Sequence, residues 1–373
     1  MNAPVSHAPT PDPRAADWDA LTADLDELGR RLRQEGVDDD LSHMHRIARW
    51  GRMCTLVGVA TAWIVPNPLS ALALSTGRVA RWAMIGHHVG HRGYERVGGP
   101  KGKDFGEGWR RPIDWLDWLV PAAWKHEHNV LHHYRLNEER DPDLVESNLH
   151  WLRETKLPQA LKVVVVAFFA LTWRWTYYAP NTLAELHRKD IKQVAGEPWE
   201  RSLFTFDPRK PAGRDYWLKS VLPYASVQLV LFPLLFAPLG WEASVAVLVN
   251  SVVGEVFANL HAFAIIVPNH AGSDMYRFET APRGKKEFYQ RQILGSVNYR
   301  TGGDLNDFLH GFLNYQIEHH LWPDLPMKAY QRAQPEVEAL CKAHGVPYVQ
   351  QSVWTRVWRT VRVMTGAESM RVW

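Results

Sequence analysis

The chain has 373 residues, 46% of them hydrophobic, and its mean hydropathy is −0.30. A chain embedded throughout in a bilayer would be more apolar, so we expect a few membrane crossings beside a substantial part that is exposed to water. The formal net charge of +3 is a slight excess rather than a clustered basic face, which argues against nucleic acid as a partner.

The N-terminal segment, residues 1–45, is polar and rich in Asp, Arg and Pro. It lacks the charged-then-apolar pattern of a signal peptide, so we expect it to lie in the cytosol. Leucines recur within it at helical spacing, at Leu21, Leu25, Leu28 and Leu32. They predict a surface helix that packs on the body of the protein.

Apolar blocks farther along the chain come in pairs. The block 47–86 is interrupted by Pro66-Asn67-Pro68, a sequence that stops a helix, so it predicts a helical hairpin. A short turn at 240–242 divides a second pair. The predicted crossings are 47–65, 68–86, 216–239 and 243–268. The sequence therefore predicts an all-α integral membrane protein with four transmembrane helices in two hairpins and a cytosolic helical cap.

The segment 157–178 is apolar but also contains Lys162 and Arg174. The histidine clusters before and after it must share one side of the membrane to build one metal site. Because the hairpin of 216–268 already returns the chain to its starting side, one further crossing would separate the clusters. We therefore expect 157–178 to be interfacial. The Lys and Arg content of the water-exposed segments places the cap, and with it the metal site, in the cytosol.

Histidines are concentrated in three clusters. These are His87, His88 and His91; His128, His132 and His133; and His319 and His320 with Gln316. Residues i and i+4 share one face of a helix, so each cluster can present neighbouring side chains to one metal ion. Imidazole binds zinc, copper, iron and nickel, so the residue type alone does not name the metal. A catalytic zinc takes three protein ligands, whereas these clusters offer enough nitrogens for two ions.

Two more histidines lie near the end of the last predicted crossing. His270 can complete the ligand set, whereas His261, nine residues earlier, would lie about 13 Å deeper on a continuous helix. We therefore expect His270 to bind metal and His261 to be a polar group within the bundle. Other polar residues near the clusters are candidates to accept a hydrogen bond from a ligand imidazole, or to have structural roles. These candidates are His88, His126, Asn137, Asp141, Asp304, Asp307 and His310.

The C-terminal tail, 349–373, is basic and aromatic. Trp354 and Trp358 alternate with Arg356, Arg359 and Arg362. Two interpretations stay open: this segment rests on acidic lipid head groups, or it is a simple surface helix.

The third histidine cluster carries a resemblance to a known family. Residues 311–326 read GFLNYQIEHHLWPDLP, which resembles the third histidine box of front-end acyl-lipid desaturases, where Gln replaces the first His. The likeness continues to LCKAHGVPY at 340–348. The first box, His87 to His91, and the second, His128 to His133 followed by Asp141-Pro142-Asp143, fit the wider membrane fatty acid desaturase family. The resemblance covers about 46–348, which we expect to be one membrane desaturase-like domain.

The resemblance implies a function and a ligand set. It implies that two iron ions use O2 to desaturate a lipid-linked fatty acyl chain. The implied ligands are His87, His91, His128, His132, His133, His270, His319 and His320, with Gln316 beside them. Many front-end enzymes carry a fused haem domain with a His-Pro-Gly-Gly motif, which does not occur here. We therefore expect a separate electron donor, a ferredoxin or a cytochrome, beside the acyl substrate and membrane lipids as partners.

Two other functions stay open at this point. An acyl or lipid hydroxylase would use the same di-iron centre and return oxygen to the carbon. A histidine-rich membrane protein that binds or transports metal would place ligands along a pathway inside the crossings. The predicted clusters lie just outside the crossings, which favours an active site at the cytosolic face.

Overall fold

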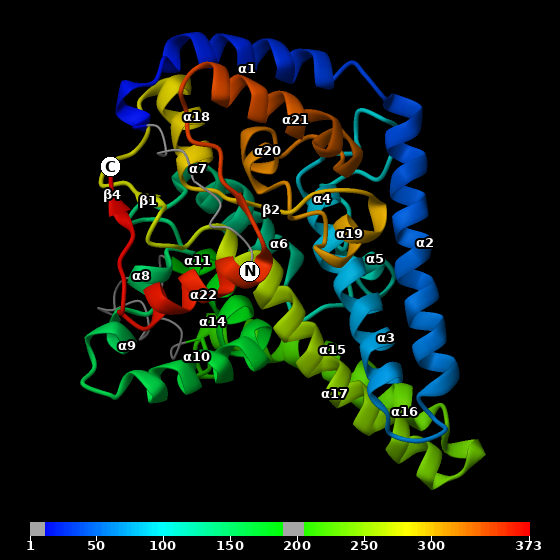
Figure 1. The fold of residues 1–373 in the computed structure, drawn as a ribbon. Helices are drawn as coiled ribbons and strands as arrows, with labels where there is room; N and C mark the ends of the chain where they lie inside the picture. The colour runs from blue at the N-terminus through cyan, green and yellow to red at the C-terminus, as the bar shows by residue number, and fades with distance from the viewer. Residues whose placement is uncertain (1–11, 189–204) are drawn as a thin grey trace, which may run out of the picture.

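The computed structural model describes residues 12–188 and 205–373, and its regular structure is predominantly helical (Figure 1). In these ranges strands occur only as short parallel pairs. β1 (Tyr276–Arg277) pairs with β4 (Arg371–Val372), and β2 (Asn298–Tyr299) pairs with β3 (Gln350–Gln351). The helical class predicted from the sequence is confirmed.

The first helices form the predicted hairpin. After a 3-10 turn (Pro13–Ala15) come α1 (Trp18–Leu32), α2 (Val37–Thr61) and α3 (Pro68–Val79). The Asn67 side chain accepts a hydrogen bond from the Ser70 N–H at 2.8 Å, and Pro68 occupies the first helical position, so α3 begins where the sequence indicates. The helix continues through a π-helical segment (Ala80–Gly86) into α4 (His87–Gly90). α4 carries His87 and His88 of the first histidine cluster, and His91 follows at its C-terminal end.

The hairpin is held by close backbone contact. A Cβ at Gly77 would lie 2.1 Å from Oγ1 of Thr55, so only glycine allows α2 and α3 to approach this closely. α3 also lies beside α17 (Figure 1).

The middle of the chain forms three longer helical stretches. The first comprises α10 (Gln159–Trp173), a π-helical segment (Arg174–Tyr178) and α11 (Ala179–Leu186). The second comprises α14 (Pro211–Asp215), α15 (Leu222–Ala225) and α16 (Phe232–Leu234), joined by π-helical segments (Tyr216–Val221, Ser226–Leu231) and ended by a 3-10 turn (Ala237–Leu239). The third is α17 (Trp241–Ile266) with a final 3-10 turn (Val267–Asn269).

We call the part of the molecule that the remaining helices form the cap. They are a 3-10 turn (Gly108–Arg110), α5 (Arg111–Asp114), α6 (Pro121–Trp124), a π-helical segment (Lys125–His132), α7 (His133–Arg135), α8 (Val145–Asn148), α9 (His150–Glu154), α18 (Gly284–Leu294), α19 (Asp304–Leu309), α20 (Gln316–Leu321), α21 (Met327–Ala343) and α22 (Val353–Met364).

Three stretches among the described residues are long and apolar enough to cross a membrane: Gln159–Leu186, Pro211–Leu239 and Trp241–Asn269. The last two contain the whole of the predicted crossings 216–239 and 243–268. The first extends the segment 157–178, so by length and composition it qualifies as a crossing although an interfacial position was predicted.

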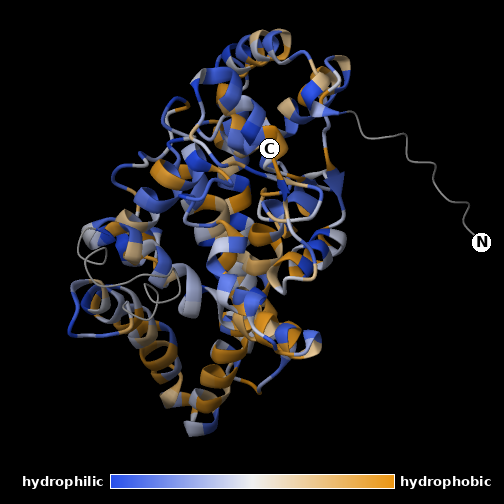
Figure 2. Ribbon diagram, turned by 90° about the vertical axis from the view of Figure 1, so that its left-hand side faces the viewer, coloured by the Kyte–Doolittle hydropathy of each residue, from blue (hydrophilic) through white to orange (hydrophobic). Residues whose placement is uncertain are grey.

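The two arms of the first hairpin do not meet this criterion of length and hydropathy. Arg49 and Arg52 in α2, and Arg78 and Arg81 in the second arm, lower the hydropathy of the predicted crossings 47–65 and 68–86. By length and composition alone, the two arms of the first hairpin therefore stay predicted crossings. The projecting end of the molecule is nonetheless strongly hydrophobic, whereas the body above it is mixed (Figure 2).

The predicted leucine helix is α1, and it packs on the body. Leu21, Leu25, Leu28 and Leu32 are all buried, in a cluster shared with Trp322 and Leu325 beyond the third histidine cluster. α1 contacts α18 and α21 (Figure 1). This packing links the predicted polar segment 1–45 to the cap.

Replacing Leu25 with Ala removes a fully buried side chain from this cluster. We expect the free energy of unfolding to fall by about 2–5 kcal/mol, because the lost contacts leave a cavity. Chemical denaturation in detergent micelles measures the change. Glu27→Ala, on the exposed face of the same helix, is the matched control. An equal loss in both variants would contradict a core role for the α1 leucines.

Candidate metal centre

The three histidine clusters converge in the cap from elements far apart in the sequence. The Nε2 atom of His87 lies 3.1 Å from that of His319 and 3.2 Å from that of His128. The Nε2 atoms of His128 and His133 are 3.3 Å apart. All of these rings are buried. Lone pairs and N–H groups of this many imidazoles are thus directed at one small region.

The convergent side chains form groups in which one ligand atom per residue lies within 4.8 Å of the others. Two adjoining groups consist of histidines alone: His87, His91, His128 and His319 in one, and His132, His270 and His320 in the other. A third group, His128, His132 and Asp143, shares one histidine with each of them. His133 lies between them, with its ring centroid 4.5 Å from that of His91 and 4.2 Å from that of His320. The Gln316 amide nitrogen lies 2.8 Å from Nε2 of His270. All nine residues predicted as ligands are therefore brought together.

Local helix geometry explains how the second cluster presents three rings. The segment Lys125–His132 is π-helical, and the backbone N–H of His133 bonds to the carbonyl of His128, five residues earlier. A π-turn is wider than an α-turn, and such turns are frequent at functional sites. The wider turn lets His132 and His133, at positions i+4 and i+5, both face the region that His128 faces.

Other residues fix the orientation of the rings through Nδ1. These contacts are His132 with Asp141 (3.0 Å), His320 with the Gln292 side-chain oxygen (2.9 Å), His270 with the Gly295 carbonyl (3.2 Å) and His319 with the Tyr330 hydroxyl (3.3 Å). An acceptor at Nδ1 selects the tautomer whose Nε2 lone pair is free. In each case Nε2 is left to face the centre.

The residues present fit a site for metal cations. Nε2 of His91 and Nε2 of His320 are buried and have no hydrogen-bond partner, which is costly unless an ion occupies the region. Burial and the neighbouring imidazoles lower the pKa of His87, His91, His128 and His319 well below the ordinary value. The rings are therefore neutral at pH 7 and can donate lone pairs to a metal.

His132 differs from the other rings. Burial opposes its charge most strongly, but the carboxylates of Asp141 and Asp143 together outweigh burial and raise the pKa of His132 above the ordinary value. Asp141 also accepts hydrogen bonds from the backbone N–H groups of Asn137 and Asp143 at 2.7 and 2.9 Å. This carboxylate therefore ties a ligand candidate to the loop that follows it.

Several of the other predicted site residues lie outside the convergent groups. His88 bonds through Nδ1 to the Met84 carbonyl at 2.6 Å and packs beside His87. Asn137 bonds to the carbonyls of Tyr276 and Gly295, so it positions the backbone near His270. His126 is half-buried and belongs to neither group.

The candidates His261, Asp304, Asp307 and His310 lie away from the convergent groups and make other contacts. His261 bonds to the Leu309 carbonyl, and His310 to the Asn306 carbonyl. Asp304 contacts His43 and Arg46, and Asp307 accepts hydrogen bonds from Asn314 and Tyr315. We expected Asp304 and Asp307 to accept a hydrogen bond from a ligand imidazole, but their contacts are with other residues. Their partners come from segments that the local sequence does not indicate.

Sequence reasoning missed Gln292, Tyr330 and Glu127. Gln292 and Tyr330 lie on α18 and α21, and their contacts with the histidines depend on tertiary packing. Glu127 is buried beside the second cluster, and burial together with Asp143 and Asp141 raises its pKa well above the ordinary value. In the sequence, only its position directly before His128 indicated that Glu127 lies near the site.

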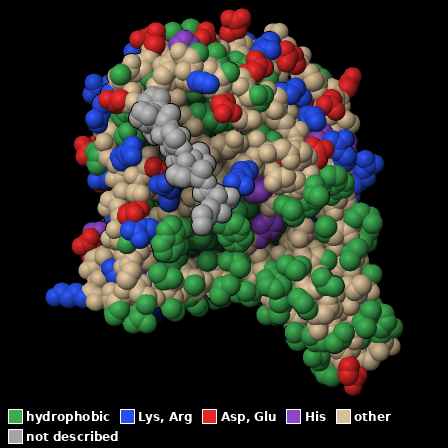
Figure 3. Space-filling model, in the orientation of Figure 1, with side chains coloured by type: hydrophobic (Ala, Val, Ile, Leu, Met, Phe, Trp, Pro, Cys, Tyr) green, Lys and Arg blue, Asp and Glu red, His purple; other side chains and the backbone are tan. Residues whose placement is uncertain are grey.

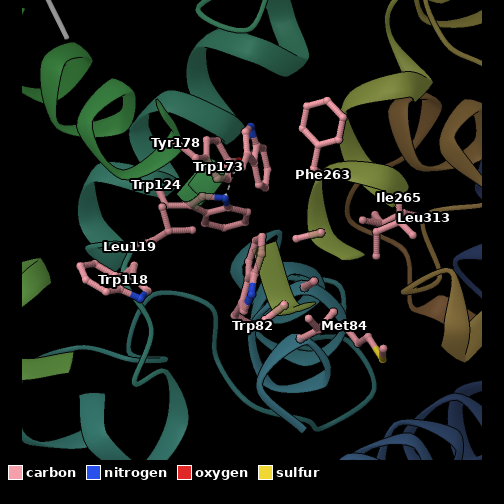
Figure 4. Close-up of a cluster of buried hydrophobic side chains, with 14 of the residues drawn as sticks. Trp82, Met84, Trp118, Leu119, Trp124, Trp173, Tyr178, Phe263, Ile265 and Leu313 are labelled. Carbon is pink, nitrogen blue, oxygen red and sulfur yellow. Dashed lines mark hydrogen bonds between the residues drawn. The ribbon is translucent and has the colours of Figure 1, made fainter. Parts of the chain in front are cut away.

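A cavity of about 460 Å³ adjoins the convergent histidines. One part is lined by His87, His128, His132, His270 and Gln316. The rest is mainly apolar and aromatic, with Trp173 and Tyr178 facing Phe263 and Leu313 in Figure 4. Its size is typical of small-molecule sites, and its walls suit an apolar chain.

Comparison with known proteins gives one family. The family model described as Fatty acid desaturase matches residues 61–352. An NADPH-dependent stearoyl-CoA 9-desaturase of Mycobacterium tuberculosis is 24% identical over 93% of this chain and 79% of its own. An acyl-lipid (7-3)-desaturase of Rebecca salina is 26% identical over 66% of this chain and 54% of its own. A delta(8)-fatty-acid desaturase of Arabidopsis thaliana is 27% identical over 66% and 52%.

Replacing Asp141 with Asn should weaken metal binding about 10- to 100-fold, because His132 loses the carboxylate that orients its ring. Competition with a chelator, read by elemental analysis of the protein, measures the affinity. Asp304→Asn is the matched control, since Asp304 also contacts a histidine, His43, but not the convergent groups. Equal metal affinity in the Asp141 variant and the unaltered protein would contradict the orienting role.

Proposed function

Because the chain belongs to the fatty acid desaturase family, we propose that it introduces a C=C bond into a lipid-linked fatty acyl chain at a non-haem di-iron centre. The chain is an oxidoreductase of fatty acid metabolism. The observation that carries the proposal is the convergence of buried histidines beside an apolar cavity. Such a site brings a metal and an unreactive hydrocarbon chain together.

The proposed ligands of the two irons are the residues predicted from the sequence. They are His87, His91, His128, His132, His133, His270, His319 and His320, with Gln316 beside His270. The two adjoining groups and the linking position of His133 support two ions rather than one. Iron, when bound, supplies the dioxygen chemistry that removes hydrogen from a methylene group.

The chain's own residues orient the ligands and hold the substrate. Asp141, Gln292 and Tyr330 keep three imidazoles in a single orientation through Nδ1. The apolar walls exclude water and place a methylene group against the side of the centre formed by His87, His128, His132 and His270. Which methylene reacts then depends on how far the acyl chain extends into the cavity.

The carrier of the acyl chain is proposed to be a membrane lipid. The resemblance of residues 311–326 to the third box of acyl-lipid enzymes supports this choice. A relative that covers most of the chain is named for stearoyl-CoA, so an acyl thioester is the competing carrier. We further propose that electrons arrive from a separate ferredoxin or cytochrome.

We propose that the protein is a multi-pass membrane protein with four crossings, in which α10 lies at the interface and the cap faces the cytosol. In Figure 1, α10 runs across the direction of α3 and α17 at the base of the cap. Arg78, one of the arginines that lower the hydropathy of the second arm, has a partner, because it pairs with Glu255 of α17 at 3.1 Å. Paired charges allow a helix to lie in the bilayer at lower cost.

Product analysis tests the reaction. The iron-loaded protein, supplied with O2, NADPH, ferredoxin, its reductase and phospholipids, should yield acyl chains that lack two hydrogens. His319→Ala should abolish turnover and lower bound iron, because His319 belongs to the first convergent group. Mass spectrometry with mapping of double bonds measures the products. Acyl chains that gain a hydroxyl group and no double bond would instead show a hydroxylase.

Narrowing the cavity should change which acyl chains are accepted. Val166 of α10 lines the cavity and is buried, so Val166→Trp should shift turnover toward shorter chains. Competition between acyl lipids of different length, analysed by mass spectrometry, measures the preference. The matched control is Val164→Trp, since Val164 lies on the same helix but is 61% exposed. The same preference in both variants would show that the cavity does not hold the acyl chain.

A further inference from the structure

The C-terminal helix α22 lies beyond the residues that match the family model and has two unlike faces. Trp354 and Trp358, one helical turn apart, are 75% and 61% exposed. Arg356, Thr360 and Met364 on the other face are buried. Two large indoles in water are costly, so the exposed face is expected to meet something other than solvent.

The buried face fixes α22 firmly to the cap beside the metal centre. The Arg356 guanidinium pairs with Asp274 at 2.8 Å, and the Thr360 hydroxyl donates to the Ala271 carbonyl at 2.8 Å. These bonds reach the segment that directly follows His270. Met364 lines the cavity. The helix is thus a wall of the cavity.

The other contacts of α22 place it beside the apolar helices. The Gln159 side chain at the start of α10 donates to the Thr365 hydroxyl, and α22 also packs against α17. Beyond Gln159, the exposed side chains of α10 are apolar, among them Leu161, Val164 and Phe168. In Figure 3 hydrophobic side chains gather along this edge of the molecule and over the projecting helices, whereas charged side chains cover the opposite end. A bilayer around α10 and α17 therefore extends to α22.

Composition favours lipid over a protein partner on the exposed face. Tryptophan is enriched at the boundary between water and hydrocarbon, and arginine side chains reach the head groups from there. Arg362 lies beside the Trp358 ring, with its guanidinium carbon 5.8 Å from the ring centroid. Arg359 and Arg362 are each only about a third exposed and lie within reach of Asp274 and Glu368. The exposed face of α22 thus has tryptophan side chains at its centre and arginine side chains at its border.

We propose that α22 is an in-plane interfacial helix, with Trp354 and Trp358 among the lipid head groups and Met364 in the wall of the cavity. One helix then separates the cavity from the bilayer surface. The interpretation of the tail as a lipid contact is preferred over a simple surface helix. Anionic lipid is not required, because the arginines of α22 already have acidic neighbours in the protein.

Spin labelling of the full-length protein tests this position. Single cysteines replace Trp354 or Trp358 after Cys54 and Cys341 have been changed to Ser, and the labelled protein is reconstituted in phosphatidylcholine vesicles. Collision of the label with O2, which dissolves in lipid, is compared with collision with a water-soluble nickel complex. Leu234→Cys, at an exposed position of α16, is the lipid control. Glu338→Cys, on the exposed face of α21, is the water control.

Labels at 354 and 358 should show a ratio of O2 to nickel collisions clearly above that of the Glu338 site. A ratio equal to that of the Glu338 site would overturn the proposal and leave the face to a protein partner. If either tryptophan variant fails to fold, exposed Thr355 beside Trp354 carries the label with the same expectation. The readout requires neither iron nor turnover, so its failure is distinguishable from failure of the proposed desaturation.

Discussion

Eight imidazoles must keep a fixed orientation in a place that excludes water and keeps all of them but His132 neutral, and the cap is built around this constraint. Each ring disfavours charge on its neighbours, and burial disfavours it further. Neutral rings can still bind a metal poorly if they rotate, so acceptors at Nδ1 are needed as well. Asp141, Gln292 and Tyr330 come from three separate segments, and this is why the site requires the whole cap.

A buried network of charges positions the helices that deliver the ligands. Arg174 pairs with Asp117 and with Glu255 of α17, and Arg78 of α3 pairs with the same glutamate. The Tyr224 hydroxyl also contacts Glu255. Buried charges of this kind are tolerated only when paired, so the network fixes α3 and α17 relative to each other. α3 leads to His87 and α17 leads to His270, and the network therefore helps to set the spacing between two ligand clusters.

The sequence predicted the parts of the site that depend on local spacing. Pairs of histidines four residues apart share a helix face wherever they occur, and the break at Pro66-Asn67-Pro68 predicted the first hairpin. The choice of His270 over His261 followed from helix rise alone, and only His270 lies in a convergent group. Gln292 and Tyr330 could not be found in this way, because no local pattern marks a contact between α18 or α21 and α20. Local reasoning also could not show how the charge of Arg78 in a predicted crossing is compensated, since its partner lies far away in the sequence.

Access to the centre is one-sided, and this follows from which rings line the cavity. His87, His128, His132 and His270 line it, whereas His91, His133, His319 and His320 are not among its lining residues. The far side is covered by packed groups, with Tyr330 beside His319 and Gln292 beside His320. Among the described residues, this cavity therefore offers an acyl chain an approach from the side of α10, α17 and α22. In the proposed assignment, the histidines on that side are metal ligands and also form the surface against which a methylene group lies, so their positions would affect both metal binding and regioselectivity.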